Sequence, residues 1–499
     1  MNKRVLLINF YSPKSLGLRF LEKSLEKLGF EVWVLYFKGF HSTHPKKPTP
    51  IELSHLLSVI KKHDPLFIGF SVMSSLYLEV VEEAARKVRA ATNAPIVWGG
   101  VYATMFPKRC LEHSDYVIRG EGEGAITEFA DKLSKGEELS EIENLAFNRG
   151  KETIINPVRK LEYDLDKLEL AKLGQNNKYF IDSDKIYITD PLLKSYSYET
   201  SCSRGCPFAC SYCTTVGLKQ IYRDNTHYLR FRSVSLVIQE LKEAKTLMKN
   251  LVMIHFWDEI FSDDPNWIDE FCEKYKKEIG LPFNIWGHPA KTDMSLIQKL
   301  RKAGLYQVTM GIQSGSPKVR KNVFHRSGSQ EQIIAAANAF FKAKVPWVTY
   351  DFILRHPFES VEQIKETYEF CASLPGKFTL NIHDLNFLPG TNITEAAIKQ
   401  GIYTQEEMEK IMYAPMEQQY ATWWGADAHN EDINFWYHLT FLTQLKLFKG
   451  IAKRMAQKGA NEKTQKKAKM YYKYGLKAAK FKHYFLKGKA VIRAKLRFV

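Results

Sequence analysis

The chain has 499 residues, of which 45% are hydrophobic and 25% charged, and its formal net charge is +17. That length is too great for one hydrophobic core and predicts two or three domains of an ordinary globular protein. No apolar run is long enough to span a bilayer, and four of the seven cysteines crowd into twelve residues, which excludes a secreted disulfide framework and predicts a cytoplasmic protein.

Residues 1–135 alternate short apolar runs with helical patterns. The runs expected to be strands are 5–10, 32–36, 66–72, 96–98 and 116–118. The segments expected to be helices are 16–28, 51–62, 77–91 and 124–133. This alternation predicts a doubly wound, Rossmann-like parallel sheet, whose ligand would bind beyond the carboxyl ends of the strands.

Residues 136–190 are polar and irregular, and we expect them to be a connector. Over residues 191–402 the alternation resumes, and six βα units predict a parallel sheet curled into a partial barrel with its site at the carboxyl ends of the strands. The expected strands that follow the opening one are 251–256, 283–286, 307–312, 348–353 and 379–385. The expected helices are 234–248, 265–279, 294–303, 330–343 and 361–373. Residues 403–499 lose the strand pattern and predict a helical region, with helices at 435–458 and 462–484.

Three cysteines lie in one short loop between the connector and the first of these helices: Cys206, Cys210 and Cys213. Thiolates select iron–sulfur clusters or zinc. A four-iron cluster takes four ligands and this loop offers three, so one iron would stay open to a small molecule. Zinc would need a fourth ligand at matched spacing, and Cys202 breaks that spacing, so we expect Cys202 to be a bystander thiol. The other cysteines are widely separated, which predicts no second iron–sulfur cluster: Cys110, Cys272 and Cys371.

The spacing Cys206-x3-Cys210-x2-Cys213, with Tyr212 before the last cysteine, resembles the signature of radical S-adenosylmethionine (SAM) enzymes. The resemblance implies a [4Fe-4S] cluster that binds SAM at its open iron and cleaves it after one-electron reduction by a flavodoxin or ferredoxin. It also implies SAM contacts at Tyr212 and, near the ends of the second and fourth strands, at Asp258, Glu259, Gln313, Ser314 and Arg326. Arg326 would pair with the SAM carboxylate. Arg355 departs from the family, which usually has glycine at this place.

The first domain resembles the cobalamin-binding domain that is often fused to this core. The resemblance implies a cobalamin site beyond the strand ends, built from Ser12, Lys14, Gly17, Ser71, Ser74, Gly99, Gly100, Thr104, Glu121, Gly122 and Glu123. Lys14 lies where other cobalamin enzymes carry the histidine that ligates cobalt, and a protonated lysine has no lone pair to donate. Cobalamin bound here is therefore predicted to lack a histidine lower ligand. A domain of this fold that no longer binds cobalamin remains an alternative.

Together these resemblances imply a cobalamin-dependent radical SAM enzyme of α/β fold. The favoured reaction is methylation of an unactivated carbon in a hydrophobic substrate, such as a lipid, isoprenoid or tetrapyrrole, or in a secondary metabolite. One alternative is a radical SAM cyclase, coupling or rearrangement enzyme without methyl transfer. The other is a non-catalytic cobalamin- or SAM-binding sensor.

The net charge belongs to the end of the chain. Residues 445–499 hold eighteen lysines and arginines and one acid, Glu462. This tail is interleaved with aromatic and aliphatic residues, which favours peripheral contact with the inner membrane face over RNA, and a solvated face is the third alternative. We expect no nucleic-acid partner. An aromatic group before the tail is interpreted as either a substrate pocket or a helical core packed on the barrel: Tyr413, Tyr420, Trp423, Trp424, Trp436 and Tyr437.

Overall fold

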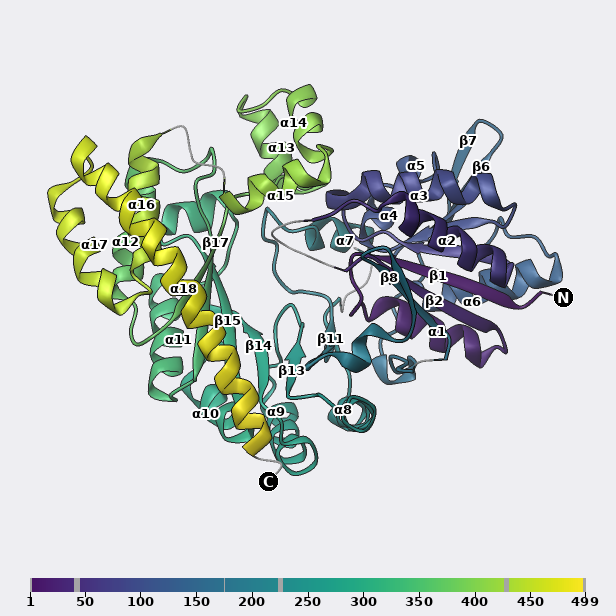
Figure 1. Cartoon of the computed structure of the whole chain (residues 1–499), viewed down its shortest axis with the longest axis horizontal. Coiled ribbons are helices and arrows are strands. Elements are labelled where there is room, and N and C mark those ends of the chain that lie inside the picture. The colour runs from purple at the N-terminus through teal and green to yellow at the C-terminus, as the bar shows by residue number, and fades with distance from the viewer. Residues whose placement is uncertain (1, 40–44, 175, 223–227, 426–429, 497–499) are drawn as a thin grey trace.

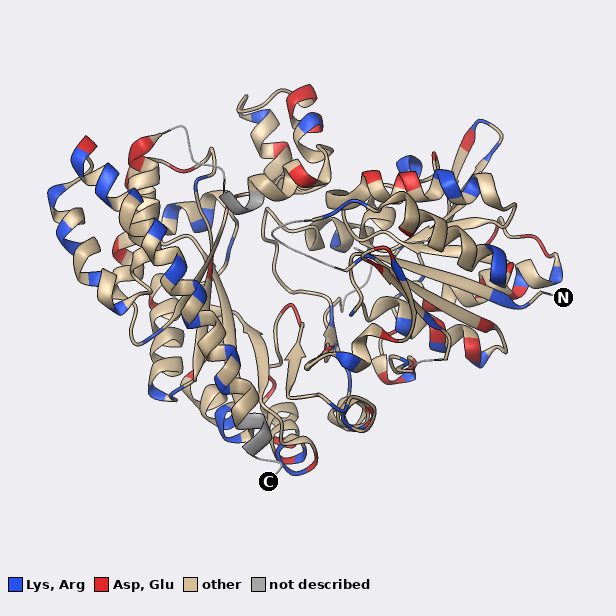
Figure 2. Ribbon diagram, viewed as in Figure 1, with Lys and Arg blue, Asp and Glu red and all other residues tan. Residues whose placement is uncertain are grey.

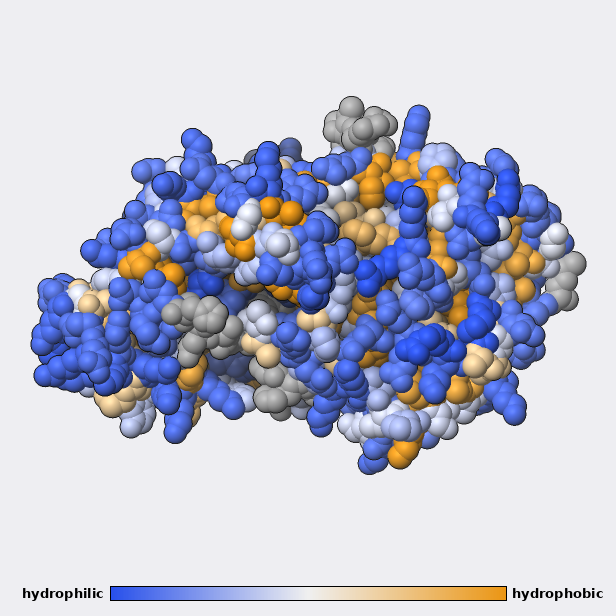
Figure 3. All heavy atoms as spheres, turned by 90° about the horizontal axis from the view of Figure 1, so that it is seen from above, coloured by the Kyte–Doolittle hydropathy of each residue, from blue (hydrophilic) through white to orange (hydrophobic). Residues whose placement is uncertain are grey.

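The computed structural model describes residues 2–39, 45–174, 176–222, 228–425 and 430–496, without the side chains of 423–425 and 493–496. Two sheets, built mainly of parallel strands, lie side by side, and helices cover each of them. A layer of carboxyl-terminal helices packs on the outside of the second sheet (Figure 1). Hydrophilic residues cover most of the face seen from above (Figure 3). Among the described residues, none of the helices combines the length and the apolar composition that a membrane crossing requires.

The first sheet has nine strands in the order β7-β6-β5-β4-β3-β1-β2-β8-β9. All five predicted strands are present: β1 (Arg4–Phe10), β2 (Glu31–Phe37), β3 (Phe67–Ser71), β4 (Ile96–Gly99) and β5 (Tyr116–Ile118). They pair in parallel, and helices cover both faces, so the strands are continuous apolar runs. The helices are α1 (Gly17–Lys27), α2 (Pro50–His63), α3 (Leu78–Ala91), α4 (Val101–Met105), α5 (Pro107–Cys110) and α6 (Glu123–Lys135), with the short turn η1 (Ser75–Tyr77) before α3.

The prediction that residues 136–190 form an irregular connector is wrong, because this segment contains four strands. They are β6 (Leu145–Arg149), β7 (Glu152–Ile155), β8 (Lys178–Asp182) and β9 (Lys185–Ile188). β8 pairs in parallel with β2, and the other three add antiparallel pairs at the two edges of the first sheet. These edge strands are short and partly exposed, so they lack the long apolar runs by which the central strands are found.

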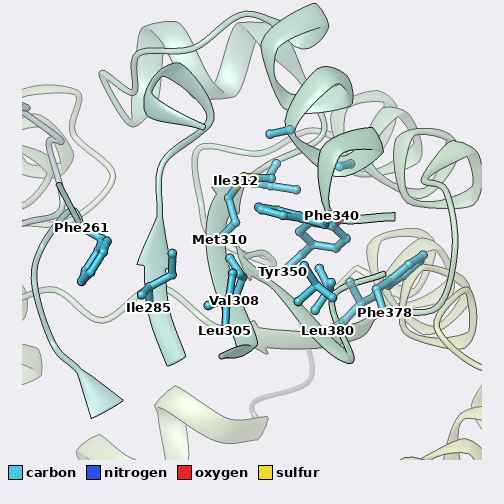
Figure 4. Close-up of a cluster of buried hydrophobic side chains, with 14 of the residues drawn as sticks. Phe261, Ile285, Leu305, Val308, Met310, Ile312, Phe340, Tyr350, Phe378 and Leu380 are labelled. Atoms are coloured by element: carbon cyan, nitrogen blue, oxygen red, sulfur yellow. The ribbon is translucent and has the colours of Figure 1, made fainter. Parts of the chain in front are cut away.

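The second sheet has six parallel strands in sequence order, as predicted: β10 (Ser197–Thr200), β13 (Met253–Phe256), β14 (Phe283–Gly287), β15 (Leu305–Gln313), β16 (Trp347–Ile353) and β17 (Thr379–His383). The helices between them are α8 (Val234–Leu247), α9 (Pro265–Lys274), α10 (Met294–Ala303), α11 (Gln330–Lys342) and α12 (Val361–Ser373). Alternate strand residues such as Val308 and Met310 point from the sheet into the apolar layer beneath the helices (Figure 4). A two-stranded hairpin of β11 (Ser203–Arg204) and β12 (Arg230–Phe231) flanks the loop that holds the cysteines.

The helical region begins with α13 (Asn392–Lys399), α14 (Gln405–Met412) and α15 (Met416–Gly425) and continues with α16 (Glu431–Leu442), α17 (Lys446–Lys458) and α18 (Glu462–Leu496). The single helix predicted at 435–458 is therefore two helices. The helix is interrupted at Leu445, whose backbone is extended, with φ −112° and ψ 110°. At the same place, the Gln444 side chain accepts a hydrogen bond from Leu380 N at 3.0 Å.

The aromatic group before the tail does not form one pocket. Tyr420 of α15 lies in the core of the first domain, whereas Trp436 and Tyr437 of α16 lie in the core of the second. The side chains of Trp423 and Trp424 lie outside the described residues. The interpretation as a helical core packed on the barrel therefore fits Trp436 and Tyr437, whereas Tyr413 and Tyr420 pack against the core of the first domain.

Candidate active site

The three cysteines lie in the loop between β11 and α7 (Thr215–Ile221), beyond the carboxyl end of β10. Ser211 fixes this loop. Its N–H donates to Phe324 O at 3.0 Å, its hydroxyl donates to Val323 O at 2.6 Å, and its carbonyl accepts from Ile393 N at 2.9 Å. These bonds join the loop to segments that follow β15 and β17, so the cysteines are held over the open end of the barrel.

Burial disfavours the thiolate forms in this loop. It raises the pKa of Cys206 to about 11 and that of Cys213 above its usual range, and the Glu259 carboxylate and the neighbouring thiols act in the same direction. Thiolates here would need the positive charge of a metal centre. In the described part of the chain, no three His, Cys, Asp or Glu side chains are placed to hold a single metal ion. Three soft donors in one loop, close enough to affect each other's pKa, nevertheless fit the ligand set of an iron–sulfur cluster.

Cys202 is not part of this loop. Its side chain is fully buried in the core of the second domain, beside α8 and α9. Burial raises its pKa far above the ordinary value. This position agrees with the expectation of a bystander thiol.

Arg326 connects the loop to β15. Its guanidinium donates to the carbonyl of Gly311, at 2.6 Å from Nη2, and to the Tyr212 hydroxyl at 3.2 Å from Nη1. Nη1 also lies 3.6 Å from Cys210 Sγ. A Cβ on Gly311 would stand 3.0 Å from Arg326 Nη2 and 2.5 Å from Gln313 Nε2. Glycine therefore leaves the space in which Tyr212, Gln313 and Arg326, three of the residues predicted to contact SAM, come together.

Gln313 and Ser314 differ in where their side chains lie. Gln313 adopts a left-handed backbone, φ 72°, at an irregularity in the pairing of β15 with β16. Its side chain lines a cavity at the open end of the barrel. Ser314 is fully buried, and its hydroxyl contacts Thr367 Oγ1 at 3.3 Å and accepts from Ser316 N at 3.1 Å. The Ser314 hydroxyl thus supports the loop from behind rather than facing a ligand.

Asp258 and Glu259 also divide into two roles. Asp258 is buried, and one of its carboxylate oxygens accepts hydrogen bonds from the Ser201 hydroxyl, at 3.2 Å, and from the Ser203 hydroxyl. Its other oxygen has no partner among the described residues, and burial raises its pKa. Glu259 is exposed, and its charge acts on the pKa of Cys206 and of Cys213. Of the two, Glu259 is the carboxylate that faces the cysteine loop.

A cavity of about 530 Å³ lies beyond the carboxyl ends of β1, β3, β4 and β5. Nine of the residues predicted to bind cobalamin line it: Ser12, Lys14, Gly17, Ser71, Gly99, Gly100, Glu121, Gly122 and Glu123. The second domain supplies part of the wall, through residues that the sequence did not indicate: Glu199, Ser201, Ser203, Arg204 and Trp257. The size lies in the range of ligand pockets, and the glycine-rich turns let a ligand approach the backbone closely.

Ser74 and Thr104 do not line this cavity. The Ser74 hydroxyl accepts from Leu76 N at 3.2 Å and caps η1. Thr104 is buried, donates to Gly100 O at 2.8 Å and accepts from Gly120 N at 2.8 Å. Thr104 therefore fixes two of the turns that form the cavity wall.

Ion pairs hold the two domains together around this cavity. Lys14 Nζ lies 2.9 Å from Glu199 Oε1. Glu123 Oε1 lies 2.5 Å from Arg204 Nη2, and although burial opposes it, the Arg204 guanidinium lowers the pKa of Glu123. Glu121 pairs with Arg204 and Arg230. Three residues that line the cavity, Lys14, Glu121 and Glu123, thus also bind the barrel through their charged groups.

Gly120 allows the closest approach of the two domains. It has φ 74°, and a Cβ there would stand 1.8 Å from the Tyr222 hydroxyl. That hydroxyl accepts a hydrogen bond from Glu121 N at 2.7 Å. Any larger residue would displace the Tyr222 ring and break its hydrogen bond with Glu121 N.

A smaller cavity, of about 230 Å³, lies at the carboxyl ends of β15, β16 and β17. Tyr212 and Gln313 line it together with Leu76 of the first domain and with Asp351. Asp351 is buried, its Oδ1 has no partner among the described residues, and burial raises its pKa to about 7. The cavity therefore combines an apolar wall with a buried carboxyl group beside the predicted SAM residues.

Arg355, where the family usually has glycine, has a left-handed backbone with φ 58°. Glycine adopts this conformation without strain. In this chain, Arg355 is held there by two hydrogen bonds to the Asp384 carboxylate, at 3.0 and 2.9 Å, and by the Tyr437 ring, whose centroid lies 3.9 Å away. Asp384 lines the smaller cavity, so the departure from the family pattern shapes the wall of that cavity.

Two segments of the chain match known families. Residues 200–371 match the radical SAM superfamily, and residues 6–130 match the B12 binding domain.

Curated relatives include enzymes of two kinds. The chain is 25% identical over 441 residues to cytidylyl-2-hydroxyethylphosphonate methyltransferase of Streptomyces wedmorensis, covering 79% of each chain. It is 26% identical over 363 residues to an uncharacterized methyltransferase of Pyrococcus horikoshii, covering 70% of this chain and 73% of the relative. It is also 26% identical over 318 residues to the anaerobic magnesium-protoporphyrin IX monomethyl ester cyclase of Cereibacter sphaeroides, covering 60% of this chain and 47% of the relative.

Solved structures share the fold. The radical SAM methyltransferase TsrM of Kitasatospora setae, with cobalamin and an iron–sulfur cluster bound, superposes with a TM-score of 0.63 at 16% identity, over 80% of this chain and 76% of that one. The cobalamin-dependent SAM radical enzyme OxsB, with aqua-cobalamin and SAM bound, gives a TM-score of 0.65 at 15% identity, over 96% and 72%. At these identities the likeness is one of architecture.

Proposed function

Because the chain is a cobalamin-dependent radical SAM enzyme with an N-terminal B12-binding domain, we propose that it transfers a methyl group to an unactivated carbon of a hydrophobic substrate. One observation carries the proposal. The cavity of the first domain opens onto the barrel beside the cysteine loop. Arg204, which lines this cavity, lies two residues before Cys206. A methyl donor in that cavity would lie next to the site of radical formation.

The donor sets fit the cofactors of this family. Cys206, Cys210 and Cys213 would hold the cluster, and Glu259 with Arg326 would bind the ammonium and carboxylate groups of SAM. The turns after β1, β3, β4 and β5 would hold cobalamin. When bound, these cofactors supply one-electron cleavage of SAM, hydrogen abstraction and methyl transfer, with electrons from a flavodoxin or ferredoxin.

The chain's own residues contribute position and exclusion of water. Ser211 fixes the cysteine loop on the barrel, and Lys14, Glu121 and Glu123 close the first domain on the second. Closing the domains shields the space between the two cavities from solvent. Holding the reacting groups in line accounts for a large part of the rate in such reactions.

The substrate would enter the smaller cavity, whose wall combines leucine and isoleucine side chains with two buried carboxyl groups, Asp351 and the Arg355-bound Asp384. An aliphatic or isoprenoid carbon with one hydrogen-bonding group nearby fits this lining. The basic tail gives no support for that assignment, because α18 packs at the other end of the barrel. Ala490 of α18 contacts Met253 and Trp347, the first residues of their strands.

A radical cyclization or coupling reaction remains the second candidate, because a cyclase is among the relatives of this chain. The two candidates differ in how SAM is used. Methyl transfer consumes one SAM as methyl donor and another as radical source, so S-adenosylhomocysteine and 5′-deoxyadenosine form in parallel. Cyclization without methyl transfer gives no S-adenosylhomocysteine.

The test uses the full chain, purified and reconstituted without oxygen and reduced with dithionite. Iron, sulfide and cobalt are measured, and a Mössbauer spectrum is recorded. SAM with a deuterated methyl group is then added with a lipid extract from cells that lack the gene. We expect a four-iron cluster, both SAM products and a deuterated methyl group in one lipid-soluble product.

Cysteine variants provide the control. Cys206→Ala should abolish the cluster and 5′-deoxyadenosine formation together, whereas Cys272→Ala and Cys202→Ala should retain both. Formation of 5′-deoxyadenosine without S-adenosylhomocysteine would select cyclization. A complete cluster that never cleaves SAM would indicate a sensor, and zinc in place of iron would overturn the whole assignment.

A further inference from the structure

The basic helix α18 lies at the end of the barrel opposite to the cysteine loop. Lys482 Nζ donates to Phe378 O, just before β17, and to Gln444 O at 3.1 Å. The Tyr306 hydroxyl donates to Leu486 O at 3.1 Å. Since these contacts are made at the amino ends of the strands, α18 covers the closed end of the barrel, far from the predicted cofactors (Figure 1).

The outward face of α18 carries an apolar stripe. Met470, Tyr474, Phe481, Phe485 and Ile492 follow one another at intervals of four and seven residues and so share one side of the helix. They are exposed, Phe481 by 75% and Ile492 by 59%. The opposite face packs on the barrel through residues such as Ala468 and Ala490. The helix is therefore apolar on two sides, and only one side has a partner in the described part of the chain.

Lysines are interleaved with this stripe along the helix, and Figure 2 shows them as blue segments that recur between tan ones. The only acid of α18 is Glu462, at its first residue. A stripe of aromatic and aliphatic side chains between rows of lysines is typical of a helix that lies in the headgroup region of an anionic bilayer. The exposed rings of Tyr474, Phe481 and Phe485 can also stack on RNA bases. The choice between a bilayer and RNA therefore depends on the aliphatic members of the stripe and on the cavity described next.

A cavity of about 830 Å³ opens on the same end of the barrel. Its floor is apolar and includes Phe340, Tyr350 and Phe378, which come together in Figure 4. Five lysines surround it: Lys344, Lys377, Lys446, Lys449 and Lys482. Within the described ranges, no carboxylate lies at ion-pair distance from any of these five. Phe341, 56% exposed, lines the cavity, and the neighbouring Leu447 is 86% exposed.

We propose that the closed end of the barrel is a docking surface for an anionic bilayer. The stripe of α18 enters the headgroup region, and the cavity takes the anionic headgroup of one lipid together with the first carbons of its acyl chain. Charge complementarity carries the choice of partner, because an apolar floor within a ring of lysines that have no carboxylate partner among the described residues matches a negatively charged amphiphile. The inference does not depend on the reaction that the enzyme performs.

The test is sedimentation of the full-length protein with vesicles. Vesicles of phosphatidylcholine alone are compared with vesicles that contain phosphatidylglycerol, at increasing salt. We expect binding to the anionic vesicles only, weakening as salt screens the lysines. Soluble dihexanoylphosphatidylglycerol and inorganic phosphate then test the cavity by calorimetry, and we expect heat from the lipid alone.

Three sets of variants separate the parts of the surface. Replacing Lys344, Lys377 and Lys446 by Glu should lower the vesicle partition coefficient at least fivefold per residue, since each lysine near an anionic surface contributes about that factor, and should abolish the calorimetric signal. Phe481→Ser with Phe485→Ser should weaken vesicle binding and leave the calorimetric signal intact. The matched control replaces three exposed lysines elsewhere by Glu: Lys87, Lys151 and Lys399. This control should change neither vesicle binding nor the calorimetric signal.

Equal loss in the control set would show that net charge, and not this surface, is responsible, and would overturn the proposal. So would equal binding to neutral vesicles, or binding of a single-stranded RNA at lower concentration than the anionic vesicles. A response to inorganic phosphate equal to that of the lipid would overturn the role of the cavity.

Discussion

Replacing Arg355 by glycine tests whether the departure from the family pattern is maintained by its contacts. The change relieves a left-handed backbone, which costs a non-glycine residue about 1 kcal/mol. It also removes the guanidinium from Asp384 in an ion pair whose side chains are only 5% and 8% exposed. Loss of one partner from a buried pair costs about 3–5 kcal/mol, and loss of the contact with the Tyr437 ring costs about 1 kcal/mol more. The relieved backbone offsets the lost ring contact, and the ion pair keeps some exposure to solvent, so we expect a net destabilisation at the low end of the ion-pair range, about 3 kcal/mol.

The companion change Asp384→Asn, made together with Arg355→Gly, separates the pair from the backbone. Without its charge, residue 384 no longer needs the guanidinium, so the double variant should recover about 2 kcal/mol relative to the single one. Lys344→Gly is the matched control, because Lys344 is also left-handed, φ 54°, but exposed. It should change stability by less than 1 kcal/mol.

The assay is thermal unfolding, at one scan rate, of the unmodified chain and four variants: Arg355→Gly, Asp384→Asn, the double variant and Lys344→Gly. A domain of about 200 residues shifts its melting temperature by roughly 2–4 °C per kcal/mol, so Arg355→Gly should melt about 6–12 °C lower. The reasoning is refuted if Arg355→Gly is as stable as the unmodified chain. It is also refuted if the effects of Arg355→Gly and Asp384→Asn are additive.

Further predictions concern the cofactor domain and a buried acid. Cobalamin-loaded protein labelled with ¹⁵N-histidine should show no histidine hyperfine coupling in its Co(II) EPR spectrum, because Lys14 lies at the position of the usual ligand; such a coupling would contradict the assignment. Gly120→Ala should lower cobalamin retained after gel filtration more than tenfold, since its Cβ would collide with Tyr222, whereas Gly136→Ala, with φ 73° and open space around it, should retain cobalamin fully. Burial raises the pKa of Glu359 to about 8, so its folded form keeps a proton that the unfolded chain releases near pH 4–5; stability is therefore lost as pH rises toward 8. The gain in melting temperature of Glu359→Gln over the unmodified chain should grow from pH 5 to pH 8, and a constant difference would disprove the shift.

The central strands of both sheets could be predicted because their residues are buried on both faces. Val5 to Ile8 of β1 are fully buried, and such runs appear in the sequence as uninterrupted apolar segments. The strands β6 to β9 could not be found in this way, since β7 and β9 at the two edges have no buried residue and β6 and β8 are short runs interrupted by polar residues. Pairing with distant strands, as β8 pairs with β2, leaves no local pattern.

The cysteine loop and the turns of the first domain could be predicted because their chemistry depends on spacing along the chain. The contribution of the second domain to the larger cavity could not, since Glu199, Arg204 and Trp257 carry no motif and gain their position only from domain packing. Asp258 and Glu259 are adjacent, so the sequence did not distinguish the buried member from the one facing the loop. The placement of α18 at the closed end of the barrel also depends on tertiary packing alone.

The edge strands of the first sheet bear on where the chain can be divided for separate expression. A fragment that stops at residue 135 would leave the backbone edges of β2 and β5 open to aggregation. It would also leave the fully buried Arg19 without Asp190, whose carboxylate accepts hydrogen bonds from the Arg19 guanidinium at 2.6 and 2.8 Å. Crystallographic or NMR work on the isolated cofactor domain should therefore begin with a fragment that runs through Ser195, which retains these strands and this aspartate.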